Sequence, residues 1–301
     1  MIKKNMDMNL LLESLIFIFS PYSNLSLYTK FNKGELLVLE RLISLKTAEK
    51  KPQLMFLLGG VVSLVCLFVS FVAFQTSSGL IMSLLVTIAI TPLMLRAVRY
   101  EEKKEEQEAS LAQGTNILAR HKDILKIYSA FFGGVIITLS IVFILLPSNF
   151  TDKIFNDQIK EINLVRGNIA FPDTFSKILV NNLGVLGLSF LFSFLFGAGA
   201  IFILAWNASI LASAIGIAAK SFGGVKGLPF AVLAFFPHGS LEILAYFVAG
   251  VAGGLISAAL TRKKSPRFNF ILKDTVQLVV ISALILTLAA IVESFEIVLS
   301  G

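Results

Sequence analysis

A histidine and a glutamate stand four residues apart in the stretch "FFPHGSLEILAYFVAG", which is otherwise almost entirely apolar. If this segment is helical, the spacing brings His238 and Glu242 close together on one face of the helix. An imidazole beside a carboxyl group can pass a proton, help to bind a cation or join two helices by a hydrogen bond. The pair is therefore the first candidate for a functional site. Which of these uses applies depends on the helices that surround the pair.

Those elements are typical of a membrane protein. The chain of 301 residues is 56% hydrophobic and 15% charged, with a mean hydropathy of +0.83, which excludes an ordinary soluble domain. A helix needs about 20 apolar residues to cross the hydrocarbon core. The fold class is all-α, a polytopic transmembrane helix bundle, because the apolar runs are long and lack the two-residue alternation of barrel strands. The sequence predicts about seven spans: 54–74, 80–97, 127–146, 179–197, 199–219, 240–260 and 276–297.

The basic residues predict the orientation of these spans. They flank membrane segments and do not form a soluble basic face, so nucleic acid is not expected as a partner of the chain. Lys and Arg are concentrated in alternate loops, which by the positive-inside rule places the N-terminus in the cytoplasm and the C-terminus outside the cell membrane. Residues 1–53 carry eight of them, 96–126 seven and 261–274 five, against four in 147–178 and two in 220–227.

Three parts of the chain are expected from these patterns. Residues 1–53 form cytoplasmic N-terminal amphipathic helices, which either lie on the inner leaflet or pack on each other as a hairpin. Residues 54–126 form a two-span hairpin with a charged cytoplasmic loop, in which the charge run after the second span is a solvated extension of the helix. Residues 127–301 form a transmembrane domain with the remaining five spans.

Glycines are expected to mark the contacts between these helices, because small residues let two helix backbones approach closely. Gly-Gly pairs stand at 59–60 and 133–134. The same packing role is predicted for Gly184, Gly187, Gly250, Gly253 and Gly254.

The sixth apolar region is too long for one straight span. Leu228 to Leu260 is 33 residues, and a continuous helix of that length would measure about 50 Å at about 1.5 Å per residue, against a core of roughly 30 Å. Pro237 has no backbone N–H and Gly239 tolerates unusual dihedral angles, so a helix break is expected at Pro237-His238-Gly239. Glu242 would then lie in the first turn of a new helix, where the helix dipole favours a negative charge.

Polar residues inside the other spans of the C-terminal half predict a buried polar site. An ionisable side chain at the centre of a bilayer costs about 2.5–3.5 kcal/mol, so such groups face the bundle interior and find partners. Glu293 lies late in the last span, at the same predicted depth as Glu242 and His238, and Glu296 is expected to reach the outer interface. The expected members of the site are Asn182, Asn207, His238, Glu242 and Glu293.

The same residues resemble a known family, the sporulation stage II protein M family of integral membrane proteins. The resemblance covers about 127–298, and its most specific element is Pro237-His238-Gly239 with Glu242. It implies that Asn182, Asn207 and Glu293 are also family positions. In spore-forming bacteria the family member acts in a membrane complex with cell-wall hydrolases, so the resemblance implies a membrane scaffold or a subunit of a complex.

Three classes of function remain open. In the first, the chain is a non-enzymatic scaffold or complex subunit with protein partners, and the polar site joins its helices. In the second, it is a transporter or channel in which His238, Glu242 and Glu293 line a polar path, since broken helices at membrane depth occur at transporter sites. An intramembrane enzyme is disfavoured, because the chain has two histidines and no HExxH, GxSxG or P-loop pattern. No metal and no cofactor is expected.

Overall fold

The structure, a computed structural model, describes residues 44–74, 77–108, 117–165, 171–197, 199–261 and 268–300. Every regular element in these ranges is a helix, which confirms the all-α prediction. The elements are α4 (Leu45–Lys50), α5 (Pro52–Ala73), α6 (Ser78–Glu108), α7 (Ile117–Arg120), α8 (Lys122–Leu145), α9 (Ser148–Ile154), α10 (Asn156–Val165), α11 (Phe171–Phe196), α12 (Ala200–Ser221), the short 3-10 helix η1 (Gly224–Gly227), α13 (Leu228–Thr261) and α14 (Phe268–Ser300).

Seven of these helices are long and apolar enough to cross a membrane, namely α5, α6, α8, α11, α12, α13 and α14. The predicted number of spans is therefore confirmed within the part of the chain that the structure describes. The amphipathic helices predicted in residues 1–43 lie outside the described residues, and α4 is the described helix of the N-terminal part.

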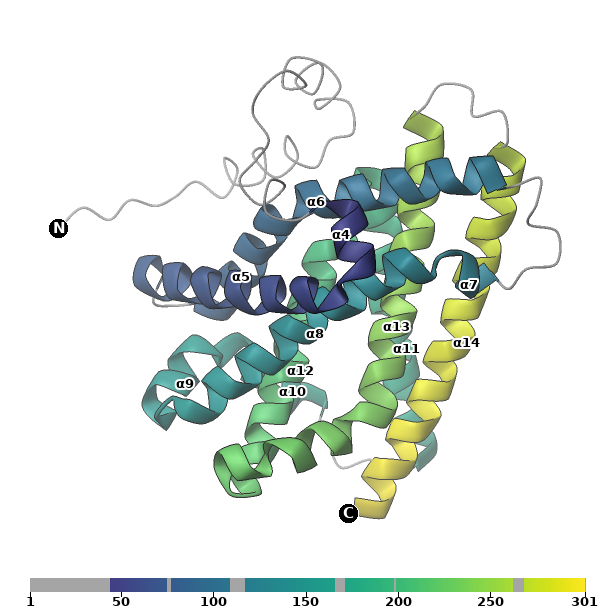
Figure 1. The fold of residues 1–301 in the computed structure, drawn as a ribbon. Helices are drawn as coiled ribbons and strands as arrows, with labels where there is room; N and C mark the ends of the chain where they lie inside the picture. Colours follow the sequence, from purple (N-terminus) through teal and green to yellow (C-terminus); the bar gives the residue numbers. More distant parts are fainter. Residues whose placement is uncertain are drawn as a thin grey trace, which may run out of the picture.

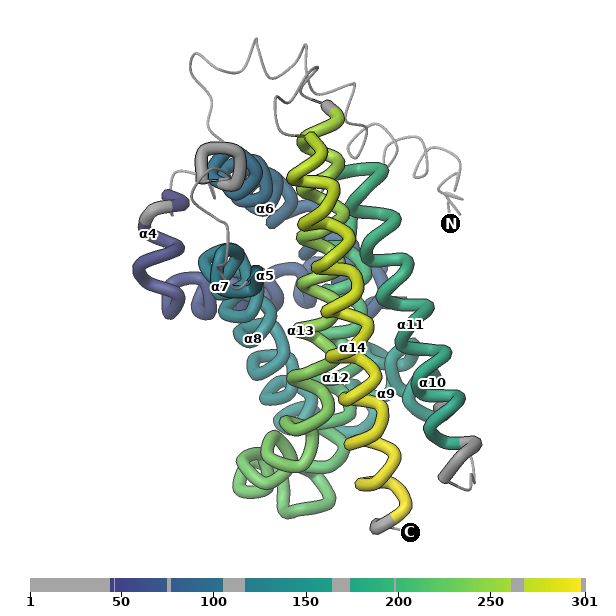
Figure 2. Tube along the Cα trace, turned by 90° about the vertical axis from the view of Figure 1, so that its right-hand side faces the viewer, coloured from purple at the N-terminus to yellow at the C-terminus, as the bar shows by residue number. Residues whose placement is uncertain are grey.

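The spanning helices form two groups that share α12. Helices α11, α13 and α14 run side by side, and α13 has extensive contacts with both of the others (Figure 2). Helix α5 packs on α8 and lies across the direction of α13 and α14 (Figure 1). Helix α12 contacts α8, α13 and α6, so it connects the two groups. The polar residues predicted for the site belong mainly to the group formed by α11, α13 and α14.

The two Gly-Gly pairs meet at the crossing of α5 and α8. A Cβ added at Gly59 would stand 2.0 Å from the Phe131 carbonyl oxygen, and one at Gly134 would stand 1.9 Å from the Phe56 carbonyl oxygen. The helix backbones therefore touch, and no residue with a side chain fits at either position. The interpretation of these glycines as packing residues is confirmed.

The other glycines divide into two groups. A Cβ at Gly253 would stand 2.3 Å from the Phe190 carbonyl oxygen of α11, so this glycine does bring α13 close to its neighbour. Gly184 and Gly187 have nothing within 4 Å of an added Cβ and are exposed, so the prediction was wrong for these two residues. They lie on the face of α11 that points away from the bundle.

The expected break at Pro237-His238-Gly239 is a bend and not an interruption. Helix α13 is continuous from Leu228 to Thr261 with Pro237 inside it, and its first part turns away from the direction of the rest (Figure 1). Proline removes one helical hydrogen bond and kinks the helix, and here the flanking turns keep the helical conformation. Gly239 has no positive φ angle, in contrast to Gly223, which precedes η1, and Gly224, its first residue.

The contact between α5 and α8 predicts a large difference between two glycine substitutions. We expect Gly134→Ala to lower the free energy of unfolding by about 1–3 kcal/mol, because the new methyl group overlaps the backbone of Phe56. Gly184→Ala, in a helix with open space around it, should be neutral or slightly stabilising. Thermal unfolding of the two purified variants in the same detergent compares them, and equal destabilisation would contradict the close crossing.

Candidate functional site

A hydrogen bond between two side chains joins α11 to α13. The Asn182 side-chain amide donates from Nδ2 to Glu242 Oε1 at 2.5 Å, and Asn182 is 7% exposed. Its own Oδ1 accepts a bond of 3.3 Å from the side-chain amide of the preceding Asn181. The amide thus uses both its donor and its acceptor, which is what burial of an asparagine between membrane helices requires.

A second contact joins α13 to α14. The carboxyl groups of Glu242 and Glu293 lie close to each other, and the buried side chain of Tyr246 lies near both of them. The two glutamates are about fifty residues apart in the chain and belong to antiparallel neighbouring helices. The structure therefore brings them together as their equal predicted depth suggested.

A third contact lies one turn further toward the bend of α13. His238 Nδ1 and Glu296 Oε2 are 2.5 Å apart, and the ring of Phe235 lies 5.6 Å from the imidazole ring between centroids. His238 is 9% exposed, whereas the side chain of Glu296 is 36% exposed. The pair thus links the interior of the bundle to its surface at the C-terminal end of α14.

We call Asn182, His238, Glu242, Glu293 and Glu296 the polar cluster. Glu296 is a member that the sequence analysis placed only at the outer interface. Its spacing of three residues from Glu293 was the available signal, because residues at i and i+3 share a helix face.

Asn207 does not make the contacts that were expected of it. Its side-chain amide donates to the main-chain oxygen of Ile203, one turn earlier on α12, at 2.8 Å. This bond stays within one helix and does not join α12 to a neighbour. A buried or half-buried asparagine is therefore no sure sign of a site shared between helices.

The polar cluster can join helices and can hold or pass protons, since it combines carboxyl, imidazole and amide groups within hydrogen-bonding distance. Among the described residues, no group of three His, Cys, Asp or Glu side chains is arranged to hold a metal ion.

A second group of charged side chains lies at the opposite end of α14, and the sequence analysis missed it. Arg120 of α7 forms an ion pair with Asp274 of α14, and the Arg120 guanidinium lies 5.4 Å from the centre of the Phe270 ring. Asp274 is 2% exposed. The pair ties the segment before α8 to the first turns of α14, and a lone acidic residue near the start of the last span was the signal in the sequence.

The beginning of the charge run that follows the second span lies near this second group of charged side chains. Glu101 and Glu102 are 3% and 0% exposed, so the expectation of a solvated helix was wrong at its beginning. Glu101 Oε1 lies 3.1 Å from His121 Nδ1, and His121 is itself buried, although it belongs to the stretch predicted as a charged cytoplasmic loop. The described part of this loop therefore packs on the bundle.

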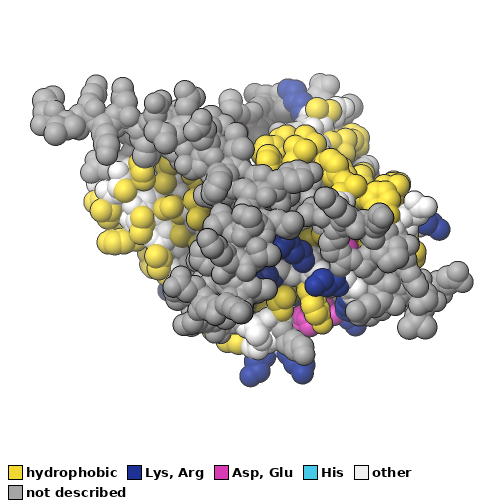
Figure 3. All heavy atoms as spheres, turned by 90° about the horizontal axis from the view of Figure 1, so that it is seen from above, with side chains coloured by type: hydrophobic (Ala, Val, Ile, Leu, Met, Phe, Trp, Pro, Cys, Tyr) yellow, Lys and Arg dark blue, Asp and Glu magenta, His cyan; other side chains and the backbone are white. Residues whose placement is uncertain are grey.

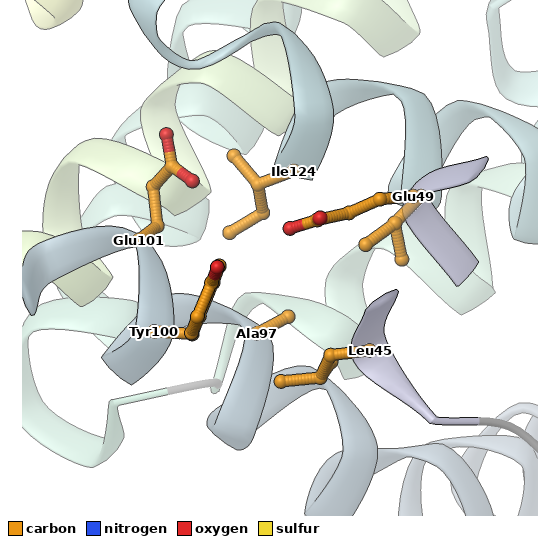
Figure 4. A pocket seen from close by; sticks show the side chains of 7 residues that line it. Leu45, Glu49, Ala97, Tyr100, Glu101 and Ile124 are labelled. Carbon is orange, nitrogen blue, oxygen red and sulfur yellow. The ribbon is translucent and has the colours of Figure 1, made fainter. Parts of the chain in front are cut away.

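A narrow crevice lies beside this second group. Figure 4 shows Leu45 and Glu49 of α4, Tyr100 and Glu101 of α6 and Ile124 of α8 around it. It is too narrow to admit a water molecule, so it is a packing defect between α4, α6 and α8 and does not offer a binding cavity.

The fold and the polar cluster define a multi-pass α-helical membrane protein with a polar site between three of its C-terminal helices. Residues 129–296 match the family described as Stage II sporulation protein M, and the chain belongs to this family. The matched region begins in α8 and contains all five members of the polar cluster. The resemblance seen in the sequence is thus confirmed.

A relative from the archaeon Methanocaldococcus jannaschii is an uncharacterised protein. It is 30% identical over 166 residues, which cover 54% of this chain and 89% of the relative. No solved structure matches the chain.

The hydrogen bond between Asn182 and Glu242 predicts different effects for two neighbouring substitutions. Asn182→Ala should lower the free energy of unfolding by about 1–2 kcal/mol, because the Glu242 carboxyl loses its amide donor inside the bundle. Asn181→Ala should have a much smaller effect, since Asn181 is exposed and bonds only to Asn182. Unfolding of the full chain in detergent micelles measures both changes. If the two variants are equally stable, the bond does not hold α11 to α13.

Proposed function

We propose that this protein is a non-enzymatic subunit of a protein complex in the cell membrane, in which its helix bundle acts as a scaffold. The observation that carries the proposal is that members of the polar cluster on different helices contact one another. Asn182 links α11 to α13, while Glu242 and His238 both link α13 to α14. Three helices are therefore fixed relative to one another, as a surface that holds partner proteins requires.

Membership of the family supports the same proposal. The family is described as Stage II sporulation protein M, and the resemblance implies a place in a membrane complex. The relative from Methanocaldococcus jannaschii carries no description of activity. The proposed role for this chain is therefore the general one, assembly of a membrane complex, and not sporulation itself.

Transport is the second candidate, and one specific observation favours it. Glu296 is partly exposed, contacts the buried His238, and lies on the same helix face as Glu293. A series of ionisable side chains, Glu296, His238 and Glu293, thus leads from the surface of the bundle to the carboxyl pair between α13 and α14. Such chains of carboxyl and imidazole groups conduct protons in pumps and transporters.

The proposal includes the orientation of the chain, with the N-terminus in the cytoplasm and the C-terminus outside the cell membrane. The uneven distribution of Lys and Arg between alternate loops supports this orientation. Lys and Arg side chains are also visible on the face seen in Figure 3, which is the upper face of the molecule in Figure 1.

Single cysteines test the orientation in a Cys66→Ala background. Cysteines at the exposed positions Lys50 and Lys103 should be protected from a membrane-impermeant thiol reagent added to intact cells, because they face the cytoplasm. Cysteines at the exposed positions Lys160 and Lys226 should react. Each variant is also labelled after the cells are opened, so that an unreactive thiol is distinguished from a protected one. The reverse pattern would overturn the orientation.

A double substitution separates the scaffold from the transporter. In cells that lack the native protein, the chain with Glu242→Gln and Glu293→Gln should still assemble with its partners and restore the wild-type phenotype. The reason is that two amides keep hydrogen bonds between α13 and α14 but cannot release protons. Gentle detergent extraction, size-exclusion chromatography and mass spectrometry of the co-eluting proteins measure assembly, and Glu161→Gln on the exposed surface of α10 is the matched control.

Two outcomes would contradict the scaffold. One is a wild-type chain that elutes without any other protein. The other is a double variant that assembles normally but fails to restore the phenotype, which would favour proton-linked transport. In that case, proteoliposomes with an internal pH-sensitive dye should show a proton flux for the wild-type chain and none for the double variant.

A further inference from the structure

An exposed apolar surface lies where α12 is joined to α13, and the polar cluster does not account for it. Phe230, Leu233 and Phe236 in the first part of α13 are 66%, 69% and 62% exposed. Phe222 and Val225, which lie just before η1 and within it, are each 55% exposed. We call these five residues the apolar face. Contiguous apolar patches on a folded protein mark surfaces that contact a membrane or a partner.

The opposite side of the same segment packs on the bundle. Ala231 is fully buried, and Leu228, Val232 and Phe235 pack against the hydrophobic core. Both sides of the helix are apolar, because residues 228–237 include no polar side chain. A helix that covered the bundle toward water would carry polar residues on its outer side. The outer side of this segment is therefore suited to contact with lipid.

The direction of the segment places it along the surface of the membrane. Helices α11, α13 and α14 run side by side and are long and apolar enough to cross a bilayer (Figure 2). The first part of α13 runs across their direction, at the end of the bundle where α14 ends (Figure 1). A helix in this position lies in the plane of the interface and brings its apolar outer side to the boundary between headgroups and acyl chains.

The charge of this region indicates the kind of lipid. Lys226 in η1 is exposed and directly follows Val225 of the apolar face. The stretch from Trp206 to Leu241 contains two lysines, Lys220 and Lys226, and no acidic residue. Lys220 already donates to the end of α8 and to α9. A lysine at the edge of an apolar surface extends its ammonium group toward headgroup phosphates, so Lys226 complements anionic lipids.

We propose that η1 and the first part of α13 form an interfacial anchor in the leaflet at the end of the bundle where α14 ends. The apolar face contacts the acyl chains, and Lys226 binds the phosphates of anionic phospholipids. Such an anchor fixes the depth of the bend in α13, and with it the depth of His238, which directly follows Pro237. This goes beyond the proposed scaffold role, because the surface binds lipid and needs no protein partner.

Fluorescence quenching tests the position of the apolar face. The full chain, with Cys66→Ala and one new cysteine that carries an environment-sensitive fluorophore, is placed in vesicles of phosphatidylcholine and phosphatidylglycerol. A probe at Leu233→Cys should be quenched by lipids with a nitroxide near the headgroup and protected from aqueous iodide. A probe at Leu284→Cys, a position of similar exposure (65%) in the middle of α14, should be quenched best by a nitroxide deep in the acyl chain. Glu161→Cys on the exposed surface of α10 should be quenched by iodide.

Two results at the apolar face would overturn the anchor. One is a Leu233→Cys probe that iodide quenches as strongly as the probe at Glu161→Cys, which would place the surface in water. The other is a probe protected from iodide and from every nitroxide lipid, which would mean that a second copy of the chain covers the surface. Phe230→Cys gives an independent position in case Leu233→Cys does not fold.

Substitution of Lys226 tests the binding of headgroups. The ratio of quenching by spin-labelled phosphatidylglycerol to quenching by spin-labelled phosphatidylcholine reports the lipid preference at the Leu233→Cys probe. Lys226→Gln should weaken the preference for phosphatidylglycerol by about fivefold, because one lysine near the membrane surface is lost. The matched control Lys160→Gln, on the exposed surface of α10, should leave the ratio unchanged. An unchanged ratio in Lys226→Gln would overturn the assignment of Lys226 to anionic headgroups.

Discussion

The position of the C-terminal helices depends on the need to partner ionisable groups inside a bilayer. A carboxyl group that faced lipid alone would destabilise the folded chain by several kcal/mol. Glu242 avoids this by contacts with Asn182 on one side and Glu293 on the other. These contacts determine which faces of α11, α13 and α14 turn toward one another, and the apolar residues on the opposite faces are left for lipid or for partner proteins.

Close backbone contact provides the second constraint, at the other side of the bundle. In lipid, apolar side chains gain little from leaving one apolar environment for another, so van der Waals packing has to hold α5 against α8. Gly59 and Gly134 make this packing possible because the two backbones touch there. The molecule thus uses two different ways of joining helices, bonds between polar side chains in the C-terminal group and close packing of glycines in the N-terminal group.

The sequence predicts positions along each helix well and rotations about each helix poorly. The lengths of the apolar runs gave the seven spans, and the depths of Glu242, Glu293 and His238 indicated that they could meet. Composition does not show which way a side chain points in a helix that is apolar all round. Asn207 therefore bonds within its own helix, and Gly184 lies open where Gly253 is tightly packed.

Two further differences between the predictions and the structure also arise because local sequence does not show the neighbours of a residue. The bend in α13 was predicted as a break, because the length of the region showed that it could not be one straight span but not how many hydrogen bonds would survive around Pro237. Glu101 and Glu102 were predicted to be solvated because they belong to a charge run. Burial of such residues depends on neighbours from distant parts of the chain, here including His121, and no local pattern reveals these neighbours.

The two charged regions of α14 lie at a separation that matches the thickness of a membrane. Asp274 and Glu293 are nineteen residues apart, which corresponds to about 28 Å along a helix at about 1.5 Å per residue. The hydrocarbon core of a typical bilayer is about 30 Å thick. Because each end is held by a contact to another helix, α14 cannot tilt freely to fit a bilayer of different thickness, and hydrophobic mismatch acts directly on these two contacts.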